Sequence, residues 1–168
     1  IKVMGGATVS AISDPHKASQ EAALAMAPGA KVFSDHRALI DSGLVDAIIV
    51  ATPNDTHAAV LKDCLASDSA VFVEKPLATT VEDLKSILAW DEKRSAMTWM
   101  GLEYRFMPPV AEAIARAKEG EAGKIHQVTI REHREPFYPK VDDWNRFAER
   151  TGGTLVEKCC HYFNLMDL

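Results

Sequence analysis

Short apolar runs alternate with segments of helical periodicity along the first hundred residues. The apolar runs predict strands at residues 7–12, 31–33, 45–51, 70–73 and 97–100. The segments between them predict helices at residues 19–27, 37–42, 56–67 and 80–93. Strands that alternate with helices indicate βαβ units, whose strands lie parallel in one sheet. Residues 47–51 carry no polar side chain, which predicts a strand covered on both faces.

The pattern changes near residue 104. Pro108 and Pro109 can open a helix that ends near Gly120, because proline is tolerated in the first helical turn. Apolar and polar positions then alternate over residues 125–131, which is typical of a strand in an antiparallel sheet with one face in solvent. The chain is therefore predicted to hold an α/β domain at residues 1–103 and the beginning of an α+β domain at residues 104–168.

Composition and charge exclude two classes of protein. Among 168 residues, 19 are Lys or Arg and 24 are Asp or Glu, which gives a net charge of -5. This balance predicts no basic surface for nucleic acid or for an anionic membrane. No apolar run approaches the ~20 residues of a membrane-spanning helix. The hydrophobic share of 47% is that of a globular protein.

The cysteines indicate a reducing compartment. Three cysteines cannot all pair within the chain, and Cys159 and Cys160 are neighbours, which is a poor geometry for a mutual disulfide. We therefore expect a cytoplasmic protein. The chain opens without Met and ends inside a helical pattern, so we expect a piece of a longer protein.

Polar residues follow the predicted strands at the sheet edge where ligands bind. Asp14 is suited to hydrogen bonds with the hydroxyls of an adenosine ribose, whereas on spacing alone an Asp before Pro15 is an ordinary helix cap. Residues 52–57 can line a ligand or can be a turn that caps the next helix, with His57 in solvent. Residues 103–105 follow the last strand.

Lys75 is the cation at the end of the fourth predicted strand. Residues 70–73 bring it to the sheet edge, and Pro76 fixes the direction in which the chain leaves. A lysine held between Glu74 and a pocket can donate to a substrate oxygen. The alternative is an exposed lysine that pairs with Glu74.

Three polar residues share one face of the helix predicted at residues 154–168. Glu157, His161 and Asn164 lie at positions i, i+4 and i+7. A carboxylate one turn from an imidazole can orient it and raise its pKa, as general acid or base catalysis requires. One alternative is a solvated Glu–His pair. A metal site with Cys160 is the other, but adjacent helical side chains point about 100° apart, so no metal is predicted.

These segments resemble the glucose–fructose oxidoreductase/inositol dehydrogenase (Gfo/Idh/MocA) family in their order along the chain. The resemblance rests on residues 45–54 (VDAIIVATPN), residues 73–77 (VEKPL), Gly101 with residues 104–106, and residues 152–155 with Glu157 and His161. It spans nearly the whole chain. The chain itself carries neither GxGxxG nor GxxxxGK[ST], the glycine-rich loops that bind phosphate.

The resemblance implies an oxidoreductase that moves a hydride between the nicotinamide of NAD and a secondary hydroxyl of a sugar, cyclitol or polyol. NADP is disfavoured because Asp14 would repel its 2′-phosphate. The implied fold is a doubly wound Rossmann sheet followed by a domain with an antiparallel sheet. That second sheet helps to bind substrate and joins subunits of a homo-oligomer. No metal, nucleic acid or membrane is implied.

The resemblance also implies roles for individual residues. Lys75 polarises the reacting oxygen, His161 takes or returns the hydroxyl proton, and Glu157 orients His161. The cofactor-binding residues are Asp14, Thr52, Pro53, Asn54, His57, Glu74, Lys75, Pro76 (in a cis peptide) and Arg105. The substrate-binding residues are Lys75, Tyr104, Trp144, His161 and Asn164.

Two positions depart from the family pattern, in which Asp stands at both. Glu157 keeps the charge on a longer stem, and Asn164 loses it. Two alternatives stay open: a member that binds NAD and a ligand without turnover, and an NAD-assisted glycoside hydrolase.

The resemblance further implies that residues 1–4 end the first Rossmann helix and that the first strand lies upstream. That strand is central in the order 3-2-1-4-5-6. The strands at residues 7–12 and 45–51 are therefore expected to have unpaired inner edges.

Overall fold

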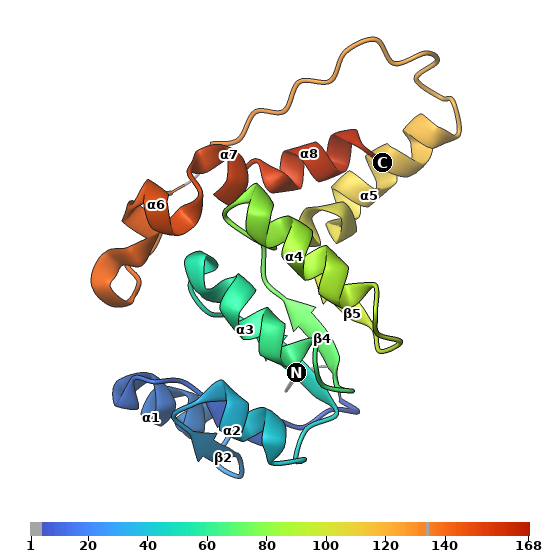
Figure 1. Cartoon of the computed structure of the whole chain (residues 1–168). Coiled ribbons are helices and arrows are strands. Elements are labelled where there is room, and N and C mark those ends of the chain that lie inside the picture. The colour runs from blue at the N-terminus through green and yellow to red at the C-terminus, as the bar shows by residue number, and fades with distance from the viewer. Residues whose placement is uncertain (1–4, 134) are drawn as a thin grey trace.

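The computed structural model describes residues 5–133 and 135–168, so the helix end predicted at residues 1–4 lies outside the described part. Strands and helices alternate in the first part, as predicted (Figure 1). In chain order they are β1 (Ala11–Ser13), α1 (Lys17–Met26), β2 (Lys31–Phe33), α2 (His36–Asp41), β3 (Ala47–Val50), the 3-10 turn η1 (Asn54–Thr56), α3 (His57–Cys64), β4 (Ala70–Val73), α4 (Val81–Asp91) and β5 (Thr98–Met100).

Every strand pair in the described part is parallel. β1 pairs with β2, with Ala11 opposite Lys31. β3, β4 and β5 form a second sheet, in which Ala47 lies opposite Ala70 and Val71 lies opposite Thr98. The parallel α/β architecture predicted for this part of the chain is thus confirmed.

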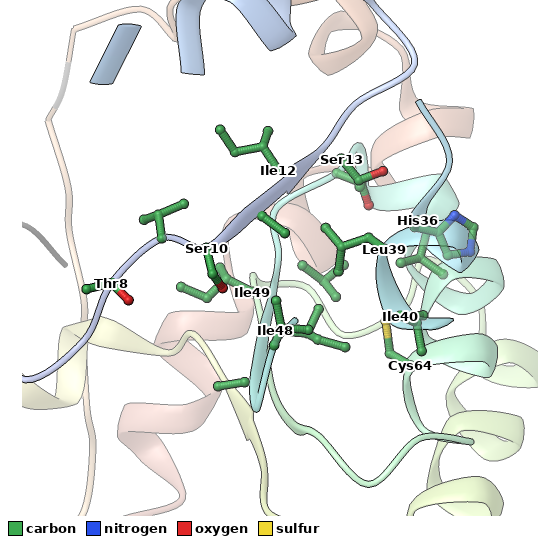
Figure 2. Close-up of a pocket in the computed structure, with 17 residues that line it drawn as sticks. Thr8, Ser10, Ile12, Ser13, His36, Leu39, Ile40, Ile48, Ile49 and Cys64 are labelled. Carbon is green, nitrogen blue, oxygen red and sulfur yellow. The ribbon is translucent and has the colours of Figure 1, made fainter. Parts of the chain in front are cut away.

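β1 and β3 belong to different sheets and face each other across a cavity of about 300 Å³ (Figure 2). Ser10 and Ile12 lie on one side of it and Ile48 and Ile49 on the other. Within residues 5–133 and 135–168 no strand pairs with the inner edge of β1 or of β3, as predicted. Residues 7–10 lie outside β1, contrary to prediction, because a strand end without a neighbour has no ladder to join. Ile49 is 54% exposed, so the prediction that β3 is covered on both faces is wrong.

The core lies between the three-stranded sheet and helices α3 and α4. Its buried members are Val50, Leu61, Cys64, Leu65, Val71, Val73 and Ile87. Thr80 caps the N-terminus of α4, and its hydroxyl oxygen accepts a hydrogen bond from the backbone N–H of Asp83 at 3.1 Å. The capping start predicted for this helix is therefore confirmed.

The second part of the chain contains short helices. They are η2 (Glu103–Phe106), α5 (Pro108–Lys118), η3 (Val141–Arg146), α6 (Ala148–Thr151), α7 (Thr154–Glu157) and α8 (Cys160–Met166). Residues 125–131 form no strand, so this prediction is wrong. They belong to a long trace between α5 and the last helices (Figure 1), where no described segment pairs with them. A strand needs such a partner for its backbone hydrogen bonds. None of the helices in the described part is long and apolar enough to span a membrane.

The helix predicted at residues 154–168 is divided into α7 and α8. The backbone N–H groups of Lys158 and Cys159 both donate to the carbonyl of Thr154, at 3.0 and 3.1 Å. The second of these bonds spans five residues, which inserts one residue into the turn. Glu157 and His161 therefore do not share one regular helical face.

Gly152 links α6 to α7 with φ 79°. A Cβ at this position would lie 2.8 Å from Cγ1 of Val156 and 3.3 Å from Cα of Thr79. We expect Gly152→Ala to lower the thermal midpoint of the full-length protein by several degrees, because backbone strain and a steric clash add up. Gly120→Ala is the control, since Gly120 has φ +83° and open space around it. Equal losses of the thermal midpoint in the two variants would contradict the clash.

Candidate active site

Lys75 connects the end of β4 with α7. Its Nζ donates to the main-chain oxygen of Glu157 at 3.0 Å and lies 3.6 Å from the Oε1 atom of the same residue. The two side chains are only 20% and 14% exposed. The alternative of an exposed Lys75 that pairs with Glu74 is therefore wrong. The Lys75–Pro76 peptide bond is cis, as the resemblance implies.

The imidazole of His161, on α8, is buried against η2. Its ring stacks on Tyr104, with centroids 4.1 Å apart and planes inclined by 11°. The Nε2 atom lies 3.6 Å from Oε1 of Glu103, and Nδ1 is buried with no hydrogen-bond partner in the described part. The carboxylate that faces the imidazole thus comes from Glu103. The predicted orientation of His161 by Glu157 is wrong, because the wide turn between α7 and α8 leaves Glu157 beside Lys75.

Burial lowers the pKa of His161 below its ordinary value of 6.5, because desolvation disfavours the imidazolium. The Glu103 carboxylate opposes this shift, whereas the cations of Lys75 and Lys158 add to it. The rise predicted from Glu157 is therefore wrong. At neutral pH the ring is the neutral form, which can accept a proton.

Arg105 and Asn164 join η2 to α8. The Nε–H group of Arg105 donates to Oδ1 of Asn164 at 3.0 Å. An amide oxygen accepts this hydrogen bond as a carboxylate would. Asn164, in place of the Asp of the family pattern, therefore keeps the contact with Arg105 and lacks the negative charge.

Three pairs thus lie near the carboxyl ends of β4 and β5: Lys75 with Glu157, Tyr104 with His161, and Arg105 with Asn164. The Lys75 cation is near enough to His161 to influence its pKa. We call these six residues the cluster.

His57 lies below the loops that follow β3 and β4. It is 0% exposed, with Nδ1 at 2.8 Å from the carbonyl oxygen of Pro76 and Nε2 at 3.0 Å from that of Thr52. A neutral ring donates to one of these carbonyls. His57 therefore supports the two loops from inside the protein. Both predictions for this residue are wrong, because a fully buried ring neither lines the dinucleotide nor lies in solvent. Asn54 is also buried, and its Nδ2 lies 3.5 Å from the carbonyl oxygen of Thr151.

The remaining predicted cofactor residues stand at the ends of β1, β3 and β4. Asp14 directly follows β1, and its Oδ1 accepts from the backbone N–H of His16 at 2.7 Å, as in the helix-cap alternative. That bond uses one carboxylate oxygen. Pro53 is half-buried before η1, and Glu74 is exposed after β4.

Trp144 lies in η3, and no hydrogen bond or ring contact within the described part joins it to the cluster.

Two charged residues that were not predicted, Lys158 and Glu132, contact the cluster. Lys158 carries a usable signal in the sequence, since it stands between Glu157 and two cysteines in a mostly apolar segment. In the residues that the structure describes, no group of His, Cys, Asp and Glu is arranged to hold a metal ion.

Two family models match the chain. Residues 3–102 match one described as an oxidoreductase family with an NAD-binding Rossmann fold, and residues 114–168 match its C-terminal alpha/beta domain. The chain belongs to the Gfo/Idh/MocA oxidoreductase family. The parallel sheet described above is thus the Rossmann fold of a Gfo/Idh/MocA protein, and NAD is the cofactor of that fold.

Inositol dehydrogenases are among the similar proteins. Inositol 2-dehydrogenase 2 of Saccharopolyspora erythraea is 34% identical over 140 residues, which are 81% of this chain and 40% of that protein. Myo-inositol dehydrogenase from Lactobacillus casei, solved with NAD(H) and myo-inositol, is 30% identical with a TM-score of 0.66 over 68% of this chain and 34% of that one.

An NAD-binding protein from Listeria innocua shares the fold, with a TM-score of 0.80 at 23% identity over 94% of this chain and 45% of that one. The chain thus spans less than half the length of each of these three proteins.

Proposed function

We propose that the full-length protein oxidises a secondary hydroxyl of a cyclitol, sugar or related polyol with NAD. The observation that carries the proposal is that Lys75, held by Glu157, lies near enough to the buried imidazole of His161 to lower its pKa, at the ligand-binding edge of the sheet. The printed names of the inositol dehydrogenase relatives support a cyclitol as substrate.

The residues at this edge fit a nicotinamide dinucleotide. Asp14 offers a carboxylate oxygen at the end of β1, where a ribose diol is bound in Rossmann folds. His57 holds the loops after β3 and β4 in fixed positions, which gives the dinucleotide a preformed surface. When bound, NAD supplies the acceptor for the hydride that leaves the substrate carbon.

The side chains of the cluster supply the remaining chemistry. The ammonium of Lys75 stabilises the negative charge that develops on the substrate oxygen. His161, whose Nδ1 is buried without a hydrogen-bond partner in the described part, accepts the hydroxyl proton when substrate binding uncovers that nitrogen. Nε2 can then release its own proton toward Glu103, whose side chain is 61% exposed and in contact with water. The alcohol thus loses one hydride and one proton and becomes a ketone.

The test is a screen of the full-length protein with NAD against a panel of inositols, sugars and open-chain polyols. We expect reduction of NAD, followed by its near-ultraviolet absorbance, with at least one member of the panel. If no member gives reduction while one of them raises the thermal midpoint in the presence of NAD, the protein is a binding protein without turnover and the proposal fails.

Asp14 is expected to set the choice between NAD and NADP. Asp14→Ala removes the charge-assisted hydrogen bond to the ribose, so we expect the kcat/KM for NAD to fall about tenfold. The same variant removes the repulsion between the Asp14 carboxylate and the 2′-phosphate of NADP, so the relative use of NADP should rise. Asp35→Ala is the matched control, because Asp35 also accepts from the backbone N–H two residues onward, Arg37, at 3.0 Å. An unchanged ratio of NAD to NADP use in Asp14→Ala would exclude this role.

A further inference from the structure

Lys158 lies in the link between α7 and α8 and is the centre of a second group of polar side chains. Its side chain is 11% exposed, and its Nζ lies 2.9 Å from Oε1 of Glu132. The ammonium also donates to the hydroxyl of Tyr104. The hydroxyl of Tyr162 donates to Oε2 of Glu132, which closes the group from the other side. We call these four residues the Lys158 cluster.

The Lys158 cluster connects segments that are far apart in the sequence. Tyr104 comes from η2, Glu132 from the long segment after α5, and Tyr162 from α8. The Lys158 ammonium also lies 4.6 Å from the centroid of the Tyr104 ring and 5.8 Å from that of Tyr162, within the range of cation–π attraction. One cation therefore fixes both the hydroxyl and the ring of Tyr104.

Tyr104 is also the ring on which His161 stacks, with centroids 4.1 Å apart. The position of the Tyr104 ring thus defines one wall of the space in which the imidazole lies. Burying an ammonium carries a desolvation cost, and an apolar side chain of similar volume would fill the same space without that cost. Packing alone does not account for a lysine at this position.

We propose that Lys158 is a positioning residue for His161: paired with Glu132, it holds Tyr104 and so fixes the imidazole that meets the substrate hydroxyl. The proposal rests on the function proposed above, in which His161 is the base. A displacement of about 1 Å at a reacting group can cost 10²-fold in rate. Lys158 therefore acts on the reaction without touching the substrate.

The pKa of His161 reports on the charged side chains of Lys158 and Glu132. The cation of Lys158 lowers the pKa of the imidazole, and the carboxylate of Glu132 raises it. The titratable and charged groups that face or influence the ring from the neighbouring elements are Lys75, Glu103, Tyr104, Glu132 and Lys158. Removal of Lys158 and removal of Glu132 should therefore shift the His161 pKa in opposite directions.

The direct test is the titration of the His161 imidazole by NMR in the full-length protein, with its signal assigned through His161→Phe. We expect Lys158→Met to raise the imidazole pKa and Glu132→Gln to lower it. The double variant should return close to the wild-type value, because it removes a cation and an anion together. Lys118→Met, on exposed α5, is the control and should leave the titration unchanged.

Turnover provides the second readout. We expect Lys158→Met to lower kcat about tenfold with a KM for the polyol within about twofold of wild type, since the variant misplaces the base and leaves the binding groups intact. Tyr104→Phe keeps the ring under His161 and removes the hydroxyl that Lys158 binds, so it should lower kcat in the same way. This variant and Glu132→Gln decide the question if Lys158→Met does not fold.

The outcomes separate the two proposals. If the wild-type protein oxidises no member of the polyol panel, the proposed function fails, and the NMR titration still measures whether Lys158 and Glu132 control His161. If the wild-type protein is active but the imidazole titrates alike in wild type, Lys158→Met and Glu132→Gln, the role of Lys158 is overturned. Unchanged kcat in both Lys158→Met and Tyr104→Phe overturns it as well.

Discussion

Replacing Lys75 with Met in the full-length protein is expected to lower kcat for polyol oxidation by about 10²–10³-fold, while the Kd for NAD stays within about threefold. The ammonium is the group that can stabilise the developing alkoxide, and the Glu157 backbone holds it at 3.0 Å. A neutral thioether fills a similar space and supplies no charge. The loss should therefore appear in the chemical step and leave cofactor binding nearly unchanged.

The measurement combines steady-state kinetics with calorimetric titration of NAD. Lys85→Met, on the exposed face of α4, is the control and should keep wild-type kcat, because Lys85 lies outside the cluster. If Lys75→Met retains kcat within tenfold of wild type, another group stabilises the alkoxide. If the variant loses NAD binding as well, Lys75 acts mainly through the cofactor.

The alternation of strands and helices could be predicted because each signal is local. Apolar runs at residues 70–73 and the capping sequence at Thr80 depend on neighbours in the sequence, and both appear in the structure as expected. Residues 125–131 show the limit of this reasoning. Their alternating pattern is compatible with a strand, but a strand forms only where a second strand pairs with it, and that condition lies elsewhere in space.

The site residues could be chosen from the sequence, but most of their contacts could not. The resemblance points to Lys75, Tyr104 and His161, and in the structure Tyr104 stacks on His161 while the Lys75 cation influences the pKa of His161. Glu157 was expected to orient His161 because the two are four positions apart. The wide turn between α7 and α8 moves Glu157 away from the imidazole, and Glu103 of η2 faces the ring instead.

The burial of individual side chains is a second property that could not be predicted from the sequence. A histidine in the first turn of a helix is usually solvated, yet His57 is fully buried, with its ring between the carbonyl oxygen of Thr52 nearby in the sequence and that of Pro76 after β4. The domain boundary at residue 104, the homo-oligomer and the roles of the other site residues stay predictions. Each depends on groups or chains beyond the contacts described here.

His161→Phe in the full-length protein is expected to lower kcat for polyol oxidation by at least about a hundredfold, within the 10²–10⁴-fold range of general acid–base catalysis. Phenylalanine keeps a planar ring for stacking on Tyr104 and removes both nitrogens, so the thermal midpoint and NAD binding should be retained. Combining it with Lys75→Met should cost much less than the product of the two single effects, because both side chains act on the same substrate oxygen.

The pH dependence of the wild-type protein gives the matching test. Because burial lowers the His161 pKa below 6.5, the neutral base is present at neutral pH, and kcat/KM should fall only as the pH drops through that lowered value. His161→Phe should lose this acidic limb along with most of its activity. A variant that keeps near-normal kcat and the same limb would show that another group takes the proton. Tyr104 would be the first to test, since its hydroxyl is already bound to the Lys158 ammonium.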